Sequence, residues 1–121
     1  MQKNKTILVV DDDLDLLEST IEIIKNIGYD VITGTNGEEA IAKFRENMPN
    51  LVLMDIKMPK MDGYEAFFRI KEMYPDAKII LITGNEIDEI KYKKAKAVTL
   101  ILLMTKPYSY EFLRELVIRY S

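Results

Sequence analysis

Short apolar runs that end in polar residues recur along the chain. The clearest is Leu-Val-Leu-Met over residues 51–54, which leads into Asp55 and is followed by a proline and a glycine within eight positions. An unbroken apolar run of this length between turn residues is typical of a strand buried on both faces of a parallel sheet. We predict further strands over residues 7–10, 29–33, 79–82 and 98–104.

Helical patterns separate these strands. In the first, Leu14, Leu17, Ile21 and Ile24 form an apolar stripe that ends at Gly28, a residue placed as a C-terminal stop. We predict the other helices over residues 36–47, 64–74 and 86–96, and from Ser109 onwards as an N-cap.

Five strands that alternate with helices predict an α/β fold, namely a doubly wound five-stranded parallel sheet with helices on both faces, flavodoxin-like in topology. The length of 121 residues, without internal repeats or linkers, predicts one domain spanning residues 1–121. The few residues before the first strand are too short for a signal peptide, and no stretch approaches a membrane span. We therefore expect a cytoplasmic protein.

Two residue types are missing, cysteine and histidine. Their absence excludes disulfides, thiolate chemistry, histidine general bases and histidine-ligated metal sites. Carboxylates remain as metal ligands, and oxygen ligands select hard cations such as Mg2+, Mn2+ or Ca2+. The net charge of −3 disfavours nucleic-acid binding by this chain alone.

Polar residues follow four of the predicted strands. Asp11 and Asp12 follow the first, Asp55 the third, Thr83 the fourth and Lys106 the fifth. The carboxyl ends of parallel strands share one edge, so we expect these side chains to converge there. Crowded carboxylates repel one another unless a cation neutralises them, and a divalent metal with a lysine does so. Such a cluster fits phosphoryl chemistry with an aspartate nucleophile.

Taken singly, each residue also has an ordinary structural explanation. Asp11 and Asp12 suit the cap of the first helix, as does Asp13, and Thr83 suits a turn. Lys106 is one of 17 lysines and arginines. The joint pattern favours a site.

The order and spacing of these motifs resemble the receiver domains of two-component response regulators. The matching stretches are Val9-Val10-Asp11-Asp12, Met54-Asp55, Met58-Pro59, Asp62-Gly63, Ile82-Thr83-Gly84 and Lys106-Pro107. Each motif is weak alone, but together they are specific and span nearly the whole chain.

The resemblance implies that Asp55 accepts a phosphoryl group from a phosphohistidine on a sensor histidine kinase or a histidine phosphotransfer protein. It implies a Mg2+ ion, with Mn2+ as an alternative. Asp12, Asp55 and the backbone carbonyl of Lys57 would bind this ion directly, and Asp11 mainly through water.

The resemblance also assigns two further residues. Lys106 would pair with Asp55 or the phosphoryl group, and Thr83 would donate a hydrogen bond to a phosphoryl oxygen after modification. The peptide bond from Lys106 to Pro107 is expected to be cis.

The sequence departs from the family around the fifth strand. Members usually carry Gly-Ala before this strand and an aromatic residue three positions ahead of the lysine, where this chain has Thr99, Leu100 and Leu103. Readout through an aromatic side chain is therefore in question. The apolar run over 98–104 predicts an association surface, for a homodimer or a downstream protein, unless the last two helices cover it.

The leading interpretation is a signalling module rather than an enzyme, with at most self-catalysed phosphotransfer and dephosphorylation. It would switch protein contacts or relay its phosphoryl group, and Asp55-Ile-Lys57 is similar to relay intermediates. One alternative is a small phosphatase with an aspartate nucleophile on the first strand. Another is an interaction module that works without phosphorylation.

Overall fold

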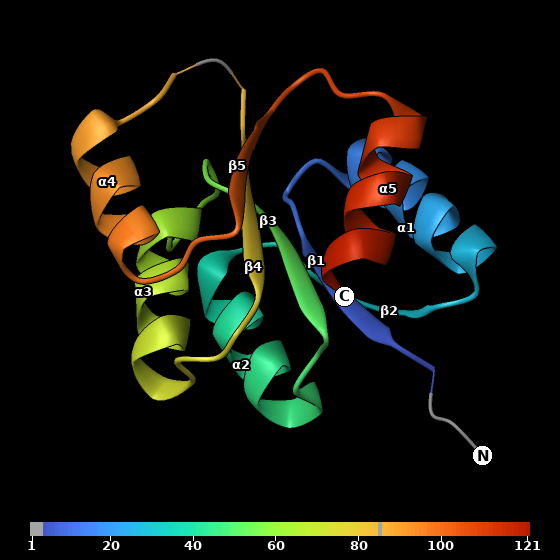
Figure 1. Cartoon of the computed structure of the whole chain (residues 1–121), viewed down its shortest axis with the longest axis horizontal. Coiled ribbons are helices and arrows are strands. Elements are labelled where there is room, and N and C mark those ends of the chain that lie inside the picture. The colour runs from blue at the N-terminus through green and yellow to red at the C-terminus, as the bar shows by residue number, and fades with distance from the viewer. Residues whose placement is uncertain (1–3, 85) are drawn as a thin grey trace.

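Strands and helices alternate strictly along the computed structural model, which describes residues 4–84 and 86–121 (Figure 1). Residues 1–3 and 85 of the predicted domain lie outside the described part. The strands are β1 (Thr6–Val10), β2 (Asp30–Gly34), β3 (Leu51–Asp55), β4 (Ile79–Thr83) and β5 (Leu102–Thr105). The helices are α1 (Leu14–Ile27), α2 (Gly37–Asn47), α3 (Gly63–Met73), α4 (Glu89–Ala97) and α5 (Tyr110–Tyr120).

The five strands form one parallel sheet in the order β2-β1-β3-β4-β5. Figure 1 shows α1 and α5 on one side of this sheet and α2, α3 and α4 on the other. Every residue of β3 and β4 is buried, which explains their unbroken apolar sequences. The predicted fold class is confirmed.

Each side of the sheet has its own hydrophobic core. The core between the sheet and α2, α3 and α4 includes Leu8, Met54, Phe67, Ile70 and Leu81. The core between the sheet and α1 and α5 includes Ile7, Leu53, Ile80, Leu113 and Val117. Successive residues of one strand alternate between the two cores, as the pleat of a strand requires. Among the described residues, no helix is long and apolar enough to cross a membrane.

Side-chain caps fix where the helices begin. The N-cap residues are Asp13, Asn36, Asp62, Asp88 and Ser109, each accepting a hydrogen bond from the first turn of its helix. The cap of α1 is therefore Asp13 rather than Asp11 or Asp12, and Oδ1 of Asp11 accepts a hydrogen bond from the N–H of Asp13 at 3.0 Å. Gly28 ends α1 in the left-handed conformation, as predicted.

Two sequence predictions about packing and boundaries were wrong. Leu14 is 66% exposed rather than buried with Leu17 and Ile24, because it starts α1 at the carboxyl edge, ahead of the turns that cover the sheet. The helix predicted over residues 86–96 begins only at Glu89, because Asp88 is its N-cap.

The predicted strand over residues 98–104 also starts too early. The N–H groups of Val98 and Leu100 both donate to the carbonyl of Ala95, and these two hydrogen bonds close the last turn of α4. Thr99, which lies between them, has a φ of 65°. These residues turn the chain, so β5 begins only at Leu102. We call residues 98–101 the α4–β5 connection. β5 does lie at the sheet edge, but Leu100 is buried there rather than exposed.

Candidate functional site

Two neighbouring strands bring three carboxylates together at the carboxyl edge of the sheet. Asp55 is the last residue of β3, and Asp11 follows β1 directly. Val10 is paired with Met54 across these strands, so the next residues stand side by side. One carboxylate oxygen from each of Asp11, Asp12 and Asp55 lies within 4.8 Å of the others. Asp11 and Asp55 are buried and Asp12 is exposed, so the cluster opens to solvent on one side.

Lys106 brings a positive charge to this cluster from the end of β5. Its Nζ lies 3.4 Å from Oδ1 of Asp55 and 3.7 Å from Oδ2 of Asp11. The backbone N–H of Lys106 donates to the carbonyl of Thr83 on β4, and the bond to Pro107 is cis, as expected. We call Asp11, Asp12, Asp55 and Lys106 the acidic pocket.

Thr83 ends β4 beside the acidic pocket, as predicted, but its hydroxyl is already engaged. The side chain is buried, and Oγ1 donates to the carbonyl of Glu86 at 2.8 Å. This bond ties the end of β4 to the segment that leads into α4. To reach a group on Asp55, the Thr83 hydroxyl has to release Glu86.

Burial and crowding favour the neutral form of the two inner carboxyls. Burial, and then the charge of Asp11, raise the pKa of Asp55 to about 6, although Lys106 opposes the shift. Burial also raises the pKa of Asp11. Burial disfavours the charged form of Lys106, but the charges of Asp55 and Asp11 outweigh it and raise the pKa of this lysine. The pocket therefore carries unrelieved negative charge at neutral pH.

The donor set of the acidic pocket suits a hard divalent cation. Three carboxylates offer oxygen ligands from one small region, and no histidine or cysteine competes with them. The loop that follows β3 carries Lys57, whose backbone carbonyl is the further ligand expected from the sequence. These residues fit Mg2+, and Mn2+ has similar ligand preferences.

Gly63 holds the helix after this loop against the phosphoacceptor candidate. Its N–H donates to the carbonyl of Ile56 at 2.7 Å, and a Cβ at this position would clash with the carbonyl oxygen of Asp55. The glycine of the Asp62-Gly63 motif is thus required by the close approach of α3 to the end of β3.

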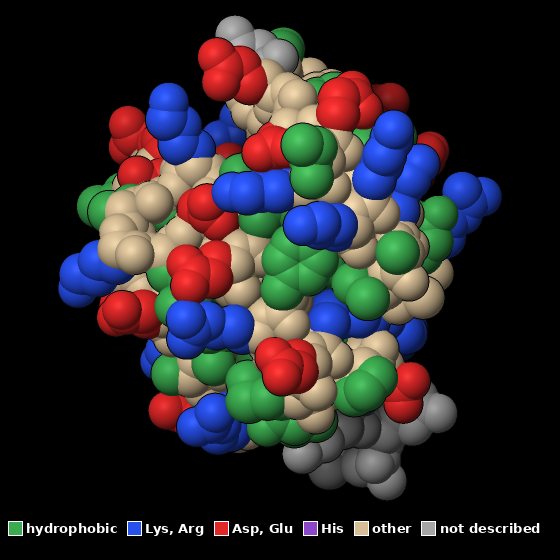
Figure 2. Space-filling model, turned by 90° about the vertical axis from the view of Figure 1, so that its left-hand side faces the viewer, with side chains coloured by type: hydrophobic (Ala, Val, Ile, Leu, Met, Phe, Trp, Pro, Cys, Tyr) green, Lys and Arg blue, Asp and Glu red, His purple; other side chains and the backbone are tan. Residues whose placement is uncertain are grey.

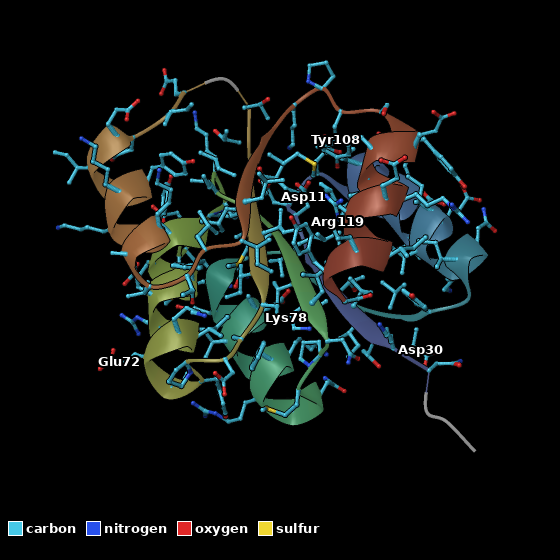
Figure 3. The ribbon with its side chains drawn as sticks, viewed as in Figure 1. Asp11, Asp30, Glu72, Lys78, Tyr108 and Arg119 are labelled. Carbon is cyan, nitrogen blue, oxygen red and sulfur yellow. The ribbon has the colours of Figure 1, made fainter. Side chains whose placement is uncertain are left out.

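Sequence reasoning missed Tyr108. This half-buried side chain follows Pro107 and lies near Asp11 at the carboxyl edge, far from Lys78 at the other end of the sheet (Figure 3). Burial raises the pKa of its hydroxyl. Its position two residues after Lys106 was the signal in the sequence that could have placed it near the acidic pocket.

Comparison with known proteins gives a consistent result. Residues 7–118 match the response regulator receiver domain family. The chemotaxis protein CheY of Thermotoga maritima is 38% identical over 106 residues, which cover 85% of this chain and 88% of that protein. A receiver domain protein of Methanospirillum hungatei superposes with a TM-score of 0.90 at 32% identity, covering 97% of this chain and 93% of that one.

Some relatives are longer proteins. The probable transcriptional regulator ycf27 of Pyropia yezoensis is 46% identical over 94 residues, which cover 74% of this chain but only 37% of that protein. The chain therefore spans little more than a third of the length of such relatives.

Proposed function

The chain belongs to the response regulator receiver domain family, and on that premise we propose that Asp55 is the residue that accepts a phosphoryl group. The observation that carries this proposal is the burial of Asp55 beside two other carboxylates and 3.4 Å from Lys106. Receiver domains take phosphoryl groups from histidine kinases or histidine phosphotransfer proteins. A carboxylate oxygen of Asp55 attacks phosphorus, the bond from phosphorus to the imidazole nitrogen breaks, and that nitrogen keeps the electron pair.

Mg2+ is the proposed cofactor of this transfer. Asp12, Asp55 and the Lys57 carbonyl would bind it directly, and Asp11 through water. When bound, the ion supplies positive charge that offsets the charge of the carboxylates and of the phosphoryl oxygens. Lys106 supplies a second positive charge, within ion-pair distance of both Asp55 and Asp11.

Thr83 is the proposed link from the acidic pocket to the surface. Its hydroxyl would leave the carbonyl of Glu86 and donate to a phosphoryl oxygen on Asp55. Because Glu86 lies two residues ahead of the α4 cap at Asp88, this exchange frees the segment that positions α4.

The output would be a change in protein contacts along β5. A groove beside this edge strand is lined by Leu102, Leu103, Met104, Tyr108 and Phe112, among others. Leu103 has no ring with which to report the movement of Thr83, so the readout would depend on how α4 and β5 present apolar area. A homodimer through this face is one form of that output.

Relay of the phosphoryl group to another protein is the second candidate. Its support is the Asp55-Ile-Lys57 arrangement and the exposure of Asp12, which leaves the acidic pocket open to a partner on one side.

The test of phosphorylation is intact mass after incubation with Mg2+ and a small phosphodonor such as acetyl phosphate. We expect one phosphoryl adduct in the wild type and none in Asp55→Asn. Asp13→Asn is the matched control, because Asp13 caps α1 near the pocket without joining the cluster, and it should be modified normally. An adduct that survives in Asp55→Asn would assign the acceptor role to another residue.

The test of output compares sedimentation of the wild type and Leu102→Glu with and without a phosphoryl mimic. Self-association that depends on the mimic and is lost in Leu102→Glu is expected for a homodimer through β5. A wild type that remains monomeric in both states would leave partner binding as the output.

A further inference from the structure

The loop between β3 and α3 (residues 56–62) is held by a helix outside the acidic pocket. We call it the β3–α3 loop; it contains Lys57. At its ends, the N–H of Ile56 donates to Ile82 of β4 and the N–H of Gly63 donates back to Ile56. Between these points, the N–H of Gly37, the first residue of α2, donates to the carbonyl of Met61 at 3.0 Å.

This contact leaves no space for a side chain at position 37, the first residue of α2. A Cβ on Gly37 would lie 2.6 Å from the carbonyl oxygen of Met61 and 2.8 Å from its Cγ, closer than real Cβ atoms approach other atoms. The backbone of Gly37 is not in the left-handed region, so the requirement for glycine comes from space rather than conformation. Met61 is only 9% exposed and cannot simply swing away into solvent.

We propose that Gly37 is a positioning residue for the magnesium site. By allowing α2 to pack directly on Met61, it fixes the β3–α3 loop and so the carbonyl of Lys57. The inference rests on the proposed function, in which that carbonyl is a metal ligand. Mg2+ requires near-ideal octahedral geometry with bonds of about 2.0–2.1 Å, so a loop displaced by a few tenths of an ångström binds it less well.

The direct test is Gly37→Ala, with Mg2+ titrated during thermal unfolding. We expect the apparent Mg2+ dissociation constant to rise about tenfold, a change of about 1.4 kcal/mol. Because Asp55 belongs to β3 and is paired with Ile82 of β4 rather than with Gly37, the phosphorylation rate should return to the wild-type value at saturating Mg2+. A purely structural defect would not separate the metal dependence from the rate in this way.

Ala42→Gly is the matched control. Ala42 lies on the exposed face of the same helix, so glycine there weakens α2 by about 1 kcal/mol without changing its contact with Met61. The Mg2+ dissociation constant of this variant should equal that of the wild type. An equal loss of affinity in both variants would overturn the proposal, because general weakening of α2 would then be enough.

A measurement on the wild type keeps the proposal testable if Gly37→Ala does not fold. Coupling is reciprocal, so Mg2+ must strengthen the contact that helps to bind it. We expect Mg2+ to slow hydrogen exchange of the Gly37 amide at least several-fold more than that of the Gly28 amide, which donates to Lys25 at the C-terminal end of α1, the end away from the acidic pocket. Equal slowing of the two amides would overturn the proposal.

The outcomes also separate this inference from the proposed function. A wild type whose stability does not respond to Mg2+ contradicts the magnesium site itself. A wild type that responds, together with a folded Gly37→Ala of unchanged Mg2+ affinity, contradicts only the positioning role.

Discussion

The acidic pocket and the α4–β5 connection both hold unfavourable interactions, but of different physical kinds. In the pocket, the cost is electrostatic, because carboxylates crowd together and the pKa of Asp55 is raised to about 6. A bound cation or a proton can relieve that cost. The pocket is therefore a region whose stability depends on the solution around it.

In the α4–β5 connection the cost is steric. Thr99 has φ of 65°, and a β-branched residue in the left-handed region is strained by about 1–2 kcal/mol. Beside the other end of α4, near Asp88 and Tyr92, the hydroxyl of Tyr64 on α3 is buried without a hydrogen-bond partner in the described part of the chain, which is a second unfavourable feature around α4. Only a change of sequence or conformation relieves such costs. Metal and pH should therefore act on the first region, and substitutions near α4 should act independently of both.

The surface over α3 and α4 shows how little apolar burial holds α4, the helix between these two features. Ala95 is the one buried residue of α4, whereas Ile90 is 69% exposed. Lysine, arginine and hydrophobic side chains are interspersed on this side of the molecule (Figure 2). A helix held this weakly would be free to move in the proposed exchange, in which Thr83 releases Glu86.

The largest expected effect is that of Mg2+ on the acidic pocket. At a Mg2+ concentration of 100 times the dissociation constant, the free energy of unfolding should rise by about 2.7 kcal/mol. Asp12→Ala should abolish most of this rise, and the metal-free variant should be at least as stable as the wild type because a repelling charge is gone. Thermal unfolding with titrated Mg2+ measures both, and an unaltered response in Asp12→Ala would remove Asp12 from the ligands.

The pH dependence of stability without metal should come second. Folded Asp55 holds its proton up to a pKa of about 6, whereas in the unfolded chain the aspartate has its ordinary pKa of 3.8. Between these two pKa values the folded state binds more protons than the unfolded chain. The contribution of Asp55 to the free energy of unfolding is therefore fully present below about pH 4 and is lost as the pH rises through 6. We expect a loss of about 2 kcal/mol relative to Asp55→Asn, measured by denaturant unfolding in EDTA.

Asp30→Asn is the control for the pH experiment. Asp30 is exposed at the start of β2, far from the acidic pocket, so the variant should keep the full pH effect. If Asp55→Asn and the wild type lose stability in parallel from pH 4 to 7, the raised pKa of Asp55 is contradicted.

The same contrast explains what could be predicted from the sequence. The acidic pocket was predictable because its parts are local signals: an apolar run marks a strand, and the residue that ends it marks the carboxyl edge. Asp11, Asp55 and Lys106 converge as expected. The engagement of the Thr83 hydroxyl with Glu86 was not predictable, because it depends on the path of a loop.

The α4–β5 connection was harder to predict for a physical reason. Val98 and Leu100 extend an apolar run, and hydrophobicity alone does not say where a chain turns. The left-handed residue that turns it is Thr99, whereas glycine is the usual local signal for that conformation. The tight contact of Gly37 with Met61 was also invisible, since it joins segments that are distant in sequence.

Thr99→Gly should raise the free energy of unfolding, by less than the amount that the pH change removes. Glycine adopts the left-handed region without strain, and its greater freedom in the unfolded chain offsets part of the gain. We expect the free energy of unfolding to rise by about 1 kcal/mol, equally with and without Mg2+, in denaturant unfolding. Thr105→Gly in the extended β5 should instead lower it. A less stable Thr99→Gly would show that the turn is not strained.

The smallest expected effect is that of Tyr64→Phe. Tyr64 is 3% exposed, and its ring stacks on Phe68 with ring centroids 6.4 Å apart. Phenylalanine keeps this packing and removes a hydroxyl whose burial is uncompensated, and such a replacement is neutral to stabilising. We expect a gain of about 0.5 kcal/mol, unchanged by Mg2+, whereas Tyr110→Phe at a half-exposed position should change nothing. Denaturant unfolding of the three proteins measures the difference. A loss of stability in Tyr64→Phe would show that the hydroxyl has a partner in solution, and the backbone of Thr99 would then be the remaining unfavourable feature around α4.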